Sequence, residues 1–173
     1  MKNKRVIHGD KTYYILDSTT IIHYIPNEEP ISKNSIILLP EGLKQEIKSP
    51  QSRAALELIE ADNQVVYTHA SQESLKKIKL LARNSGDSST LSNVDIHVLA
   101  LSLDYPDSVL ISDDYAIQNI CSLANIEFKP LFFKIKSVRK YFWKCKGCGE
   151  KYSEEIAVCP ECGNVVKRYY MRQ

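Results

Sequence analysis

The chain has 173 residues, of which 43% are apolar and 25% are charged, a composition typical of a soluble globular protein with a hydrophobic core. It holds no apolar run near the ~20 residues that a membrane-spanning helix needs, so we expect no membrane segment. Residues 1–11 are polar and lack the apolar stretch of a signal peptide, so we expect a cytoplasmic protein.

The net charge of +2 is unevenly distributed along the chain. Residues 134–173 contain ten Lys or Arg and four Glu, a formal charge of +6, whereas residues 1–133 carry −4. A basic tail on a mildly acidic body suggests that the tail holds a polyanionic partner. Simple solubility is the alternative explanation for this asymmetry.

The sequence predicts strands that alternate with helices. Short runs rich in apolar, aromatic and β-branched residues predict strands over residues 12–16, 64–68, 108–112 and 128–133. Helices are expected over residues 18–25, 40–48, 50–62, 71–82, 90–105 and 114–126, with loops at 27–34 and 83–89. Pro40 suits a first helical position, and Pro130 suggests that the last strand lies at an edge. Such alternation is typical of an α/β fold, a parallel sheet covered by helices on both faces.

The composition turns basic and aromatic near residues 134–144, where we place a boundary. The expected organisation is a body over residues 1–133, a linker over 134–144 and a small module over 145–173. The linker and the chain end mix Lys and Arg with aromatic residues, a mixture that can hold phosphates and stack bases. The alternative is that these aromatic residues merely pack a very small core: Tyr141, Phe142 and Trp143.

Two CxxC pairs separated by ten residues bring four cysteines together: Cys145, Cys148, Cys159 and Cys162. Two residues between cysteines let both thiolates turn onto one ion, and Gly149 and Gly163 allow the positive φ of a tight turn. Four sulfurs suit one closed, tetrahedral, structural Zn²⁺, which lowers the charge of the tail to +4. Redox dithiols or disulfides are the alternative, and a reducing compartment argues against them. Cys121 stands apart and is expected to be a buried helix residue.

Several carboxylates lie where strands of a parallel sheet should end. Asp17 directly follows the strand at 12–16, and Asp113 and Asp114 follow the strand at 108–112. Ligands of open parallel sheets bind outside the carboxyl ends of the strands, so these acids are candidates for one crevice that holds Mg²⁺ or Mn²⁺. A helix cap with a solvated neighbour is the ordinary explanation for the aspartate pair.

Two further acids could join this crevice, and each also has an ordinary explanation. Asp95 ends the sequence SNVD, which reads as a capping box with Ser92 as the cap. Glu46 lies in EGLKQEIK, where an exposed surface Glu is the common case. Converging acids repel one another unless a cation neutralises them, so a shared crevice implies a metal ion.

Four segments, in their order and spacing, resemble the acidic motifs of PIN-domain ribonucleases: YILDSTTII, LPEGLKQEI, GDSSTLSNVDIHVLALSL and LISDDYAIQNI. With the CxxC…CPxCG pattern that follows, the chain is similar to the Nob family, PIN-plus-zinc-ribbon endonucleases that mature the 3′ end of small-subunit ribosomal RNA. The resemblance covers residues 12–166. It implies a PIN-like parallel sheet flanked by helices, with a small C-terminal zinc ribbon.

Carried over residue by residue, the resemblance places the catalytic acids at Asp17, Glu46, Asp95 and either Asp113 or Asp114. It implies that Asp17, Asp95 and Asp113 are ligands of Mg²⁺ or Mn²⁺, with Asp113 weakly favoured over its neighbour. Ser112 stands where Thr is commoner in this family, a change that should not affect the chemistry.

The implied activity is hydrolysis of an RNA phosphodiester by water, assisted by one or two Mg²⁺ or Mn²⁺ ions, which leaves a 5′-phosphate and a 3′-hydroxyl. The implied partners are ribosomal RNA precursor and the pre-small ribosomal subunit. The four histidines are scattered, and Asp87 is expected to shape a loop. Two alternatives stay open: a toxin-type PIN ribonuclease, and a non-catalytic RNA-binding ribosome-assembly factor that does not need the acids. The cleaved bond and the oligomeric state do not follow from the sequence.

Overall fold

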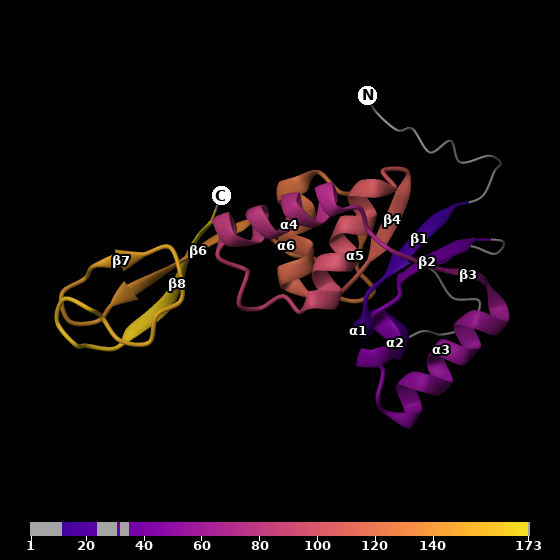
Figure 1. Cartoon of the computed structure of the whole chain (residues 1–173), viewed down its shortest axis with the longest axis horizontal. Coiled ribbons are helices and arrows are strands. Elements are labelled where there is room, and N and C mark those ends of the chain that lie inside the picture. The colour runs from indigo at the N-terminus through magenta and orange to yellow at the C-terminus, as the bar shows by residue number, and fades with distance from the viewer. Residues whose placement is uncertain (1–11, 24–30, 32–34, 173) are drawn as a thin grey trace.

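The body of the protein is built around one parallel sheet. The computed structural model describes residues 12–23, 31 and 35–172, and its five body strands pair in the order β3-β2-β1-β4-β5 (Figure 1). All of these pairings are parallel. The strands are β1 Tyr13–Leu16, β2 Ile36–Pro40, β3 Gln64–Thr68, β4 Ser108–Ile111 and β5 Phe128–Lys129.

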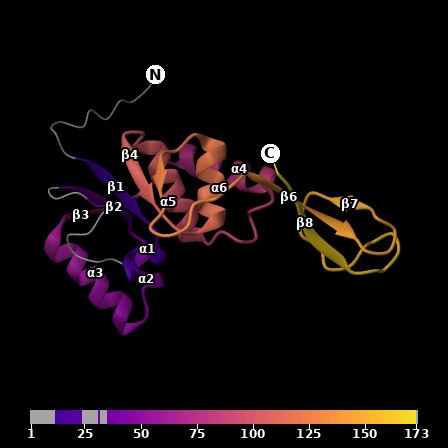
Figure 2. The same ribbon diagram turned by 180° about the vertical axis from the view of Figure 1, so that it is seen from behind.

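Helices flank this sheet, as the alternation along the chain predicts. α5 packs against β1, β2 and β4 with α4 and α6 beside it, whereas α1 and α3 pack against each other (Figures 1 and 2). Because the central strands are covered, Ile15, Leu39 and Leu110 are fully buried. The helices are α1 Ser18–Ile22, α2 Leu43–Glu46, α3 Pro50–Asp62, α4 Gln72–Ser85, α5 Asn93–Asp104 and α6 Tyr115–Ala124.

The predicted α/β class is confirmed, but sequence analysis missed one strand. The strand β2 has the sequence IILLP and is buried at every position, so it lacks the polar alternation that marks a half-exposed strand. Pro40 ends this strand instead of opening a helix, and α2 begins only at Leu43. In the part of the chain that the structure describes, no helix is long and apolar enough to cross a membrane.

Two other elements are shorter than predicted. The first helix ends at Ile22, and residues 24–25 of the predicted helix lie outside the described residues. The last body strand ends at Lys129, whereas the sequence predicts a strand to residue 133. Beyond it, the N–H groups of residues 131–133 donate to the Asp113 carboxylate, so they are not available for a strand ladder.

A second, smaller sheet forms a C-terminal lobe that extends away from the body (Figures 1 and 2). Its antiparallel strands pair in the order β7-β6-β8, and residues 139–144 of the expected linker belong to β6. Trp143 is 5% exposed and packs with two of the cysteines, so this ring fills the small core. The strands are β6 Arg139–Cys145, β7 Lys151–Tyr152 and β8 Val166–Arg172.

Candidate active site and zinc centre

Asp17 lies buried at the carboxyl end of β1, beside the end of β4. Leu16 pairs with Ile111 in the parallel ladder, and the Asp17 N–H reaches the Ile111 carbonyl at 3.5 Å. The Asp17 carboxylate caps α1 by accepting from the Thr20 N–H at 2.7 Å, and the Thr19 hydroxyl contacts both of its oxygens. Only 1% of Asp17 is exposed. This acid therefore combines the predicted position at a strand end with nearly complete burial.

Burial raises the pKa of Asp17 above its ordinary value, because the charged form loses solvation. Hydrogen bonds from Ser112, Thr20 and Thr19 lower the pKa and offset only part of this penalty. Among the described residues, no Lys, Arg or His forms an ion pair with Asp17. A buried carboxylate in this state suits a site in which a metal cation supplies the missing positive charge.

The Ser112 side chain connects Asp17 to the aspartate pair that follows β4. Its hydroxyl donates to Asp17 Oδ2 and accepts from the Asp114 N–H at 3.0 Å. Asp114 Oδ1 in turn accepts from the N–H groups of Ala116 and Ile117 at 2.6 and 3.1 Å, which makes Asp114 the N-cap of α6. The residue type alone predicts no role for Ser112, and its place between a buried strand and two acids is the signal that could have indicated one.

The Asp113 carboxylate binds the backbone of the loop after β5. Its Oδ1 accepts from the N–H groups of residues 131–133 at 2.9, 3.0 and 3.1 Å. The carboxylate thereby holds the loop after β5, whereas the Asp114 carboxylate caps α6 and its backbone N–H donates to the Ser112 hydroxyl. Both Asp113 oxygens accept backbone N–H groups, whereas among the described residues only Oδ1 of Asp114 does, which leaves Asp114 the more available ligand although the sequence weakly favours Asp113.

Asp95 and Glu46 lie in segments that reach the same end of the sheet. Asp95 forms the predicted capping box: its Oδ2 accepts from the Ser92 N–H at 2.7 Å, and its N–H donates to Ser92 Oγ at 3.1 Å. The first turn of α5 lies beside the turn after β2, because Val94 would be 3.7 Å from a Cβ at Gly42. Glu46 ends α2, which follows that turn, and it is exposed. The capping box occupies one Asp95 oxygen and does not exclude a metal ligand at the other.

The acids gather around the carboxyl end of the sheet without forming a closed ligand group. Among the described residues, the four cysteines are the one group of three or more candidate ligands whose atoms all lie within 4.8 Å of one another. Mg²⁺ ordinarily keeps several waters and takes only one or two carboxylates plus phosphate oxygens. An open set of carboxylates therefore fits Mg²⁺ or Mn²⁺ better than a cation that needs a complete cage of protein ligands.

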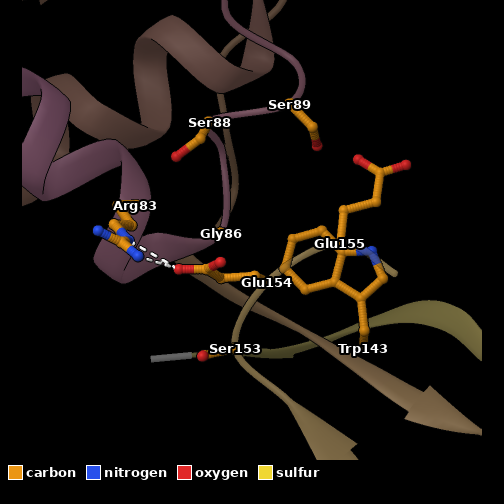
Figure 3. Close-up of a pocket in the computed structure, with 8 residues that line it drawn as sticks. All are labelled: Arg83, Gly86, Ser88, Ser89, Trp143, Ser153, Glu154 and Glu155. Atoms are coloured by element: carbon orange, nitrogen blue, oxygen red, sulfur yellow. Dashed lines mark hydrogen bonds and ion pairs between the residues drawn. The ribbon is translucent and has the colours of Figure 1, made fainter. Parts of the chain in front are cut away.

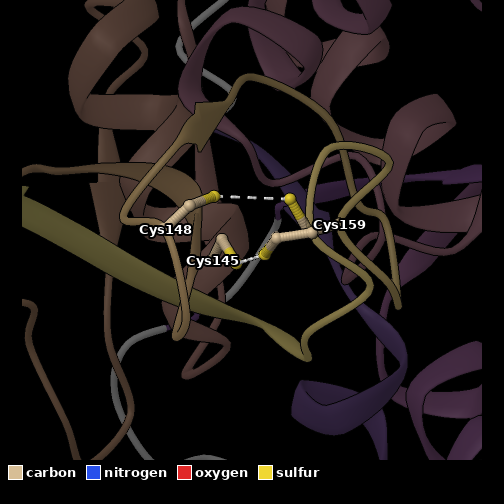
Figure 4. Close-up of side chains that lie close together, drawn as sticks. Cys145, Cys148 and Cys159 are labelled. Carbon is tan, nitrogen blue, oxygen red and sulfur yellow. Dashed lines mark hydrogen bonds between the residues drawn. The ribbon is translucent and has the colours of Figure 1, made fainter.

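The four cysteines of the small lobe converge on one point (Figure 4). The sulfurs of Cys145 and Cys162 are 3.4 Å apart, and those of Cys148 and Cys159 are 3.6 Å apart. A tetrahedral Zn²⁺ with Zn–S bonds of about 2.3 Å requires sulfurs about 3.8 Å apart, so the spacing fits zinc. Both knuckles turn through glycines with positive φ, 81° at Gly149 and 71° at Gly163, as the sequence predicts.

Asp87 joins the body to the small lobe. It is 1% exposed, and its Oδ2 accepts from Ser85 Oγ and Asn119 Nδ2 at 2.7 Å each. Its Oδ1 lies 3.5 Å from the Arg168 guanidinium, which comes from β8. Asn119 also exchanges two hydrogen bonds of 2.8 Å with the backbone of Arg139 in β6. Asp87 thus lies beneath a polar junction between the two lobes, a role that extends beyond the loop-shaping one expected from the sequence.

The loop at Gly86 allows the two lobes to approach closely. Gly86 has φ of 78°, and a Cβ there would lie 2.8 Å from the Tyr141 Cβ and carbonyl oxygen, so a larger residue would displace β6. Arg168 donates to the Gly86 carbonyl at 2.8 Å and lies over the Tyr141 ring. Beside this contact, Arg83 pairs with Glu154 across a cavity of about 350 Å³ that Trp143 and the loop at 153–155 also line (Figure 3).

One face of the β6–β8 pair is both basic and aromatic. Phe142 pairs with Tyr169 in the ladder, and their rings stack at 5.9 Å. Lys144 and Lys167 pair next along the same face, and the Lys151 amine lies 5.4 Å from the centre of the Phe142 ring. A hollow of about 580 Å³ next to the first cysteine knuckle is lined by several of these side chains. Trp143 packs the small core, as the alternative expectation holds, while the Phe142 side of the sheet is free to contact phosphates or bases, which stays a prediction.

Comparison with known proteins relates the chain to ribonucleases. Residues 14–105 match the PIN domain of ribonuclease. The chain is 36% identical over 130 residues to Endoribonuclease Nob1 of Pyrococcus abyssi, covering 74% of this chain and 80% of that protein. It is 32% identical over 166 residues to Ribonuclease VapC1 of Thermoplasma acidophilum, covering 91% and 83%. It is 34% identical over 87 residues to the 20S-pre-rRNA D-site endonuclease NOB1 of Saccharomyces cerevisiae, covering 50% and 19%.

Proposed function

Because the chain belongs to the Nob family of PIN-domain endoribonucleases, we propose that it is a Mg²⁺- or Mn²⁺-dependent endoribonuclease acting in ribosome biogenesis. Its substrate is precursor small-subunit ribosomal RNA, which it cleaves at or near the mature 3′ end, in the cytoplasm and on the pre-small ribosomal subunit. The yeast relative, a 20S-pre-rRNA D-site endonuclease, supports this substrate.

The observation that carries the proposal is the buried Asp17 carboxylate, held by a Ser112 hydroxyl that also accepts from the Asp114 backbone N–H. Asp17 is buried at the sheet end and forms no ion pair among the described residues. A protein that used this surface only for RNA affinity would have no use for buried negative charge there, because the charge repels phosphate. The arrangement suits a site that binds a divalent cation first and phosphate through it.

We assign the catalytic acids by their position around the carboxyl end of the sheet. Asp17, Asp114 and Asp95 would hold one or two ions, and Glu46 lies at the rim. A bound Mg²⁺ or Mn²⁺ neutralises charge on the phosphoryl oxygens and lowers the pKa of a bound water. The Ser112 hydroxyl ties the Asp17 carboxylate to the Asp114 backbone, and the capping box fixes the orientation of Asp95. Water would attack in line, because the Ser112, Thr19 and Thr20 hydroxyls described at this edge already donate to Asp17 or to the Ile111 carbonyl. Hydrolysis would leave a 5′-phosphate and a 3′-hydroxyl.

The small lobe supplies substrate affinity in this proposal. One structural Zn²⁺ on the four cysteines holds the lobe in shape, since all four ligands come from protein and no coordination position stays open for substrate. Its basic face offers Lys144, Lys151 and Lys167 to phosphates, with Phe142 and Tyr169 as stacking rings. Single-stranded nucleic acid is commonly bound by this combination of cations and aromatic side chains.

The likeness to a protein named only as a ribonuclease supports a second candidate function. In this case the chain is a PIN ribonuclease with another RNA substrate, a class that includes the toxin-type enzyme considered from the sequence. The same carboxylates would act in both enzymes. The position of cleavage on ribosomal precursor therefore distinguishes them, whereas metal-dependent cleavage alone does not.

The decisive experiment is incubation with a precursor fragment that spans the mature small-subunit 3′ end, with added Mn²⁺. We expect one cut at or near that end, and a rate lowered roughly a hundredfold or more, about 2.7 kcal/mol, in the Asp17→Asn variant. Equal cleavage by the variant would support the non-catalytic assembly factor instead. Cleavage of unrelated RNA at the same rate would support the second candidate.

Asp95→Asn tests the same site against the capping-box explanation. If Asp95 acts only as a cap, its replacement costs about 1 kcal/mol or less of stability and leaves cleavage by the folded fraction intact. If it holds metal, cleavage falls although the protein stays folded. Thermal unfolding of both proteins, measured beside the cleavage rates, separates the two explanations.

A further inference from the structure

Two phenylalanine rings stand exposed beside the acid crevice. Phe132 and Phe133 are each 63% exposed, although Phe is among the residue types most often buried. They lie in the loop after β5, and their ring centres are 6.4 Å apart. No part of the catalytic proposal uses them, so their exposure requires a separate explanation.

The loop that carries these rings is held in place by two side chains of the body. Asp113 accepts from the N–H groups of residues 131–133, as described above. Gln118, which is fully buried, donates to the carbonyls of Ser112 and Phe133 at 2.8 and 2.6 Å and accepts from the Ile135 N–H at 2.6 Å. Backbone held by this many bonds presents its rings in a fixed direction, as a preformed binding surface does.

The rings lie close to the carboxylates. Phe132 makes an edge-to-face contact of 5.8 Å with His23, which directly follows α1. Asp17 caps the other end of this five-residue helix, so the two ends are separated by roughly 8 Å. Asp113, which holds the loop, is the chain neighbour of both Ser112 and Asp114. A nucleotide whose phosphate lies at the acids can therefore reach the rings with an adjacent base.

The charges around the rings match RNA rather than an apolar partner. Lys129, Lys134 and Lys136 are all exposed and lie on either side of the two phenylalanines in the chain. Ammonium groups beside exposed rings attract phosphates to the place where bases can stack. A protein interface would instead be depleted of Lys around its aromatic centre.

We infer that Phe132 and Phe133, with His23, form a stacking subsite for an unpaired nucleobase of the RNA next to the cleaved bond. The inference rests on the proposed function for the identity of the ligand as RNA. It gives Asp113 a role as a positioning residue, which presents the loop and does not hold the metal. Stacking is tolerant of sequence because every base has a π-face, so this subsite contributes affinity and position rather than base identity.

The test measures binding of a short single-stranded RNA by fluorescence anisotropy in the Asp17→Asn background, which keeps the RNA uncut. Phe132→Ala and Phe133→Ala are compared with Leu80→Ala, which removes a residue of similar exposure, 61%, from α4. We expect the phenylalanine changes to weaken binding about fivefold to a hundredfold and the Leu80 change to have no effect. Phe132→Leu should bind RNA little better than Phe132→Ala, since an aliphatic side chain does not stack on a base.

RNAs with one abasic nucleotide at successive positions locate the stacked base. With both phenylalanines intact, an abasic nucleotide at one or two positions of the RNA should weaken binding. This loss of affinity should disappear in the Phe132→Ala, Phe133→Ala double variant. Abasic losses that persist in the double variant overturn the inference. So does unchanged affinity accompanied by altered self-association in sedimentation, which would make the rings an interface between copies. Cleavage by the parent with Mn²⁺ is scored separately, so a failure of the nuclease proposal is distinguishable from a failure of the subsite.

Discussion

Asp17 has a raised pKa because its charged form is poorly solvated in the folded protein, whereas in the unfolded chain it titrates near 3.8. The folded state therefore binds a proton more tightly than the unfolded state, and ionisation costs stability as the pH rises from 3.8 through the raised value. At any pH above the raised pKa of Asp17, the folded protein bears the full loss of stability caused by this ionisation. We predict that Asp17→Asn, which removes the charge and keeps the shape, raises the free energy of unfolding at pH 7.

The measurement is urea unfolding of both proteins without added Mg²⁺ or Mn²⁺ and without chelator, so that the zinc centre stays intact. The advantage of Asp17→Asn should shrink as the pH falls through the raised pKa and vanish below 3.8, where the parent carboxyl becomes protonated in the unfolded state as well. Burial also raises the pKa of Asp87, and this contribution cancels because both proteins contain Asp87. Added Mn²⁺ should stabilise the parent more than the variant, and an equal gain would count against Asp17 as a ligand.

The two adjacent aspartates should have different effects on cleavage. Asn is as good an N-cap as Asp, so Asp114→Asn should leave α6 intact and lower cleavage roughly a hundredfold or more, about 2.7 kcal/mol, by removing a ligand charge. Asp113→Asn should keep metal-dependent chemistry and weaken RNA binding by loosening the loop at 131–133. Single-turnover rates at saturating RNA separate the two effects. The opposite pattern would make Asp113 the ligand.

The sequence could not decide between these neighbours because the choice depends on a distant loop. Both residues follow the same buried strand, and either could cap α6. The Asp113 carboxylate binds N–H groups that lie about twenty residues further along the chain. Asp17 was easier to predict, since a strand end in a parallel sheet already defines where its side chain lies.

Among the elements, prediction succeeded where pattern and packing agree. The strands β1 and β4 and helices α3 and α6 were expected within a few residues, because their apolar runs are bounded by caps or prolines. The strand β2 was missed because complete burial removes its polar alternation, and Pro40 resembles a helix start. The strand β6 was assigned to a linker because its basic and aromatic residues show no apolar face until β8 pairs with it.

The zinc centre should hold the small lobe in shape independently of the body. Purified protein should contain one zinc per chain, and a strong chelator should unfold the lobe while the helices of the body persist. Trp143 is the one Trp of the chain and is 5% exposed in the core of this lobe, so its fluorescence reports on the lobe alone. Structural zinc in such modules contributes roughly 10–16 kcal/mol of apparent binding energy, more than so small a core can supply.

Cys159→Ser is the matched control, because it removes one buried ligand and changes little else. It should shift the Trp143 emission as the chelator does, with unchanged helical circular dichroism. A lobe that keeps native Trp143 emission in strong chelator, or a protein purified without zinc, would contradict the structural role.

At the scale of the whole molecule, the acids and the basic face lie on different lobes, so their relative position matters for a substrate that contacts both. The junction around Asp87 sets this position through Arg168 from β8 and through Asn119, which holds β6. The close approach at Gly86 gives the junction little freedom to shift. An RNA bound on the basic face therefore meets the carboxylates at a distance that the fold determines.

A double-mutant cycle tests whether the junction works in this way. Arg168→Met leaves the buried Asp87 carboxylate without its cation, so it should destabilise the protein more in the parent than in the Asp87→Asn background. The coupling should be about 0.5–3 kcal/mol, as for other pairs in direct contact. Zinc content should stay at one per chain in every variant, because neither residue is a ligand.

Cleavage of a long precursor, which can span both lobes, should fall in both single variants, whereas cleavage of an RNA too short to reach the basic face should not. Equal losses on long and short RNA would mean that the junction supports only folding, and that the two lobes act on RNA independently.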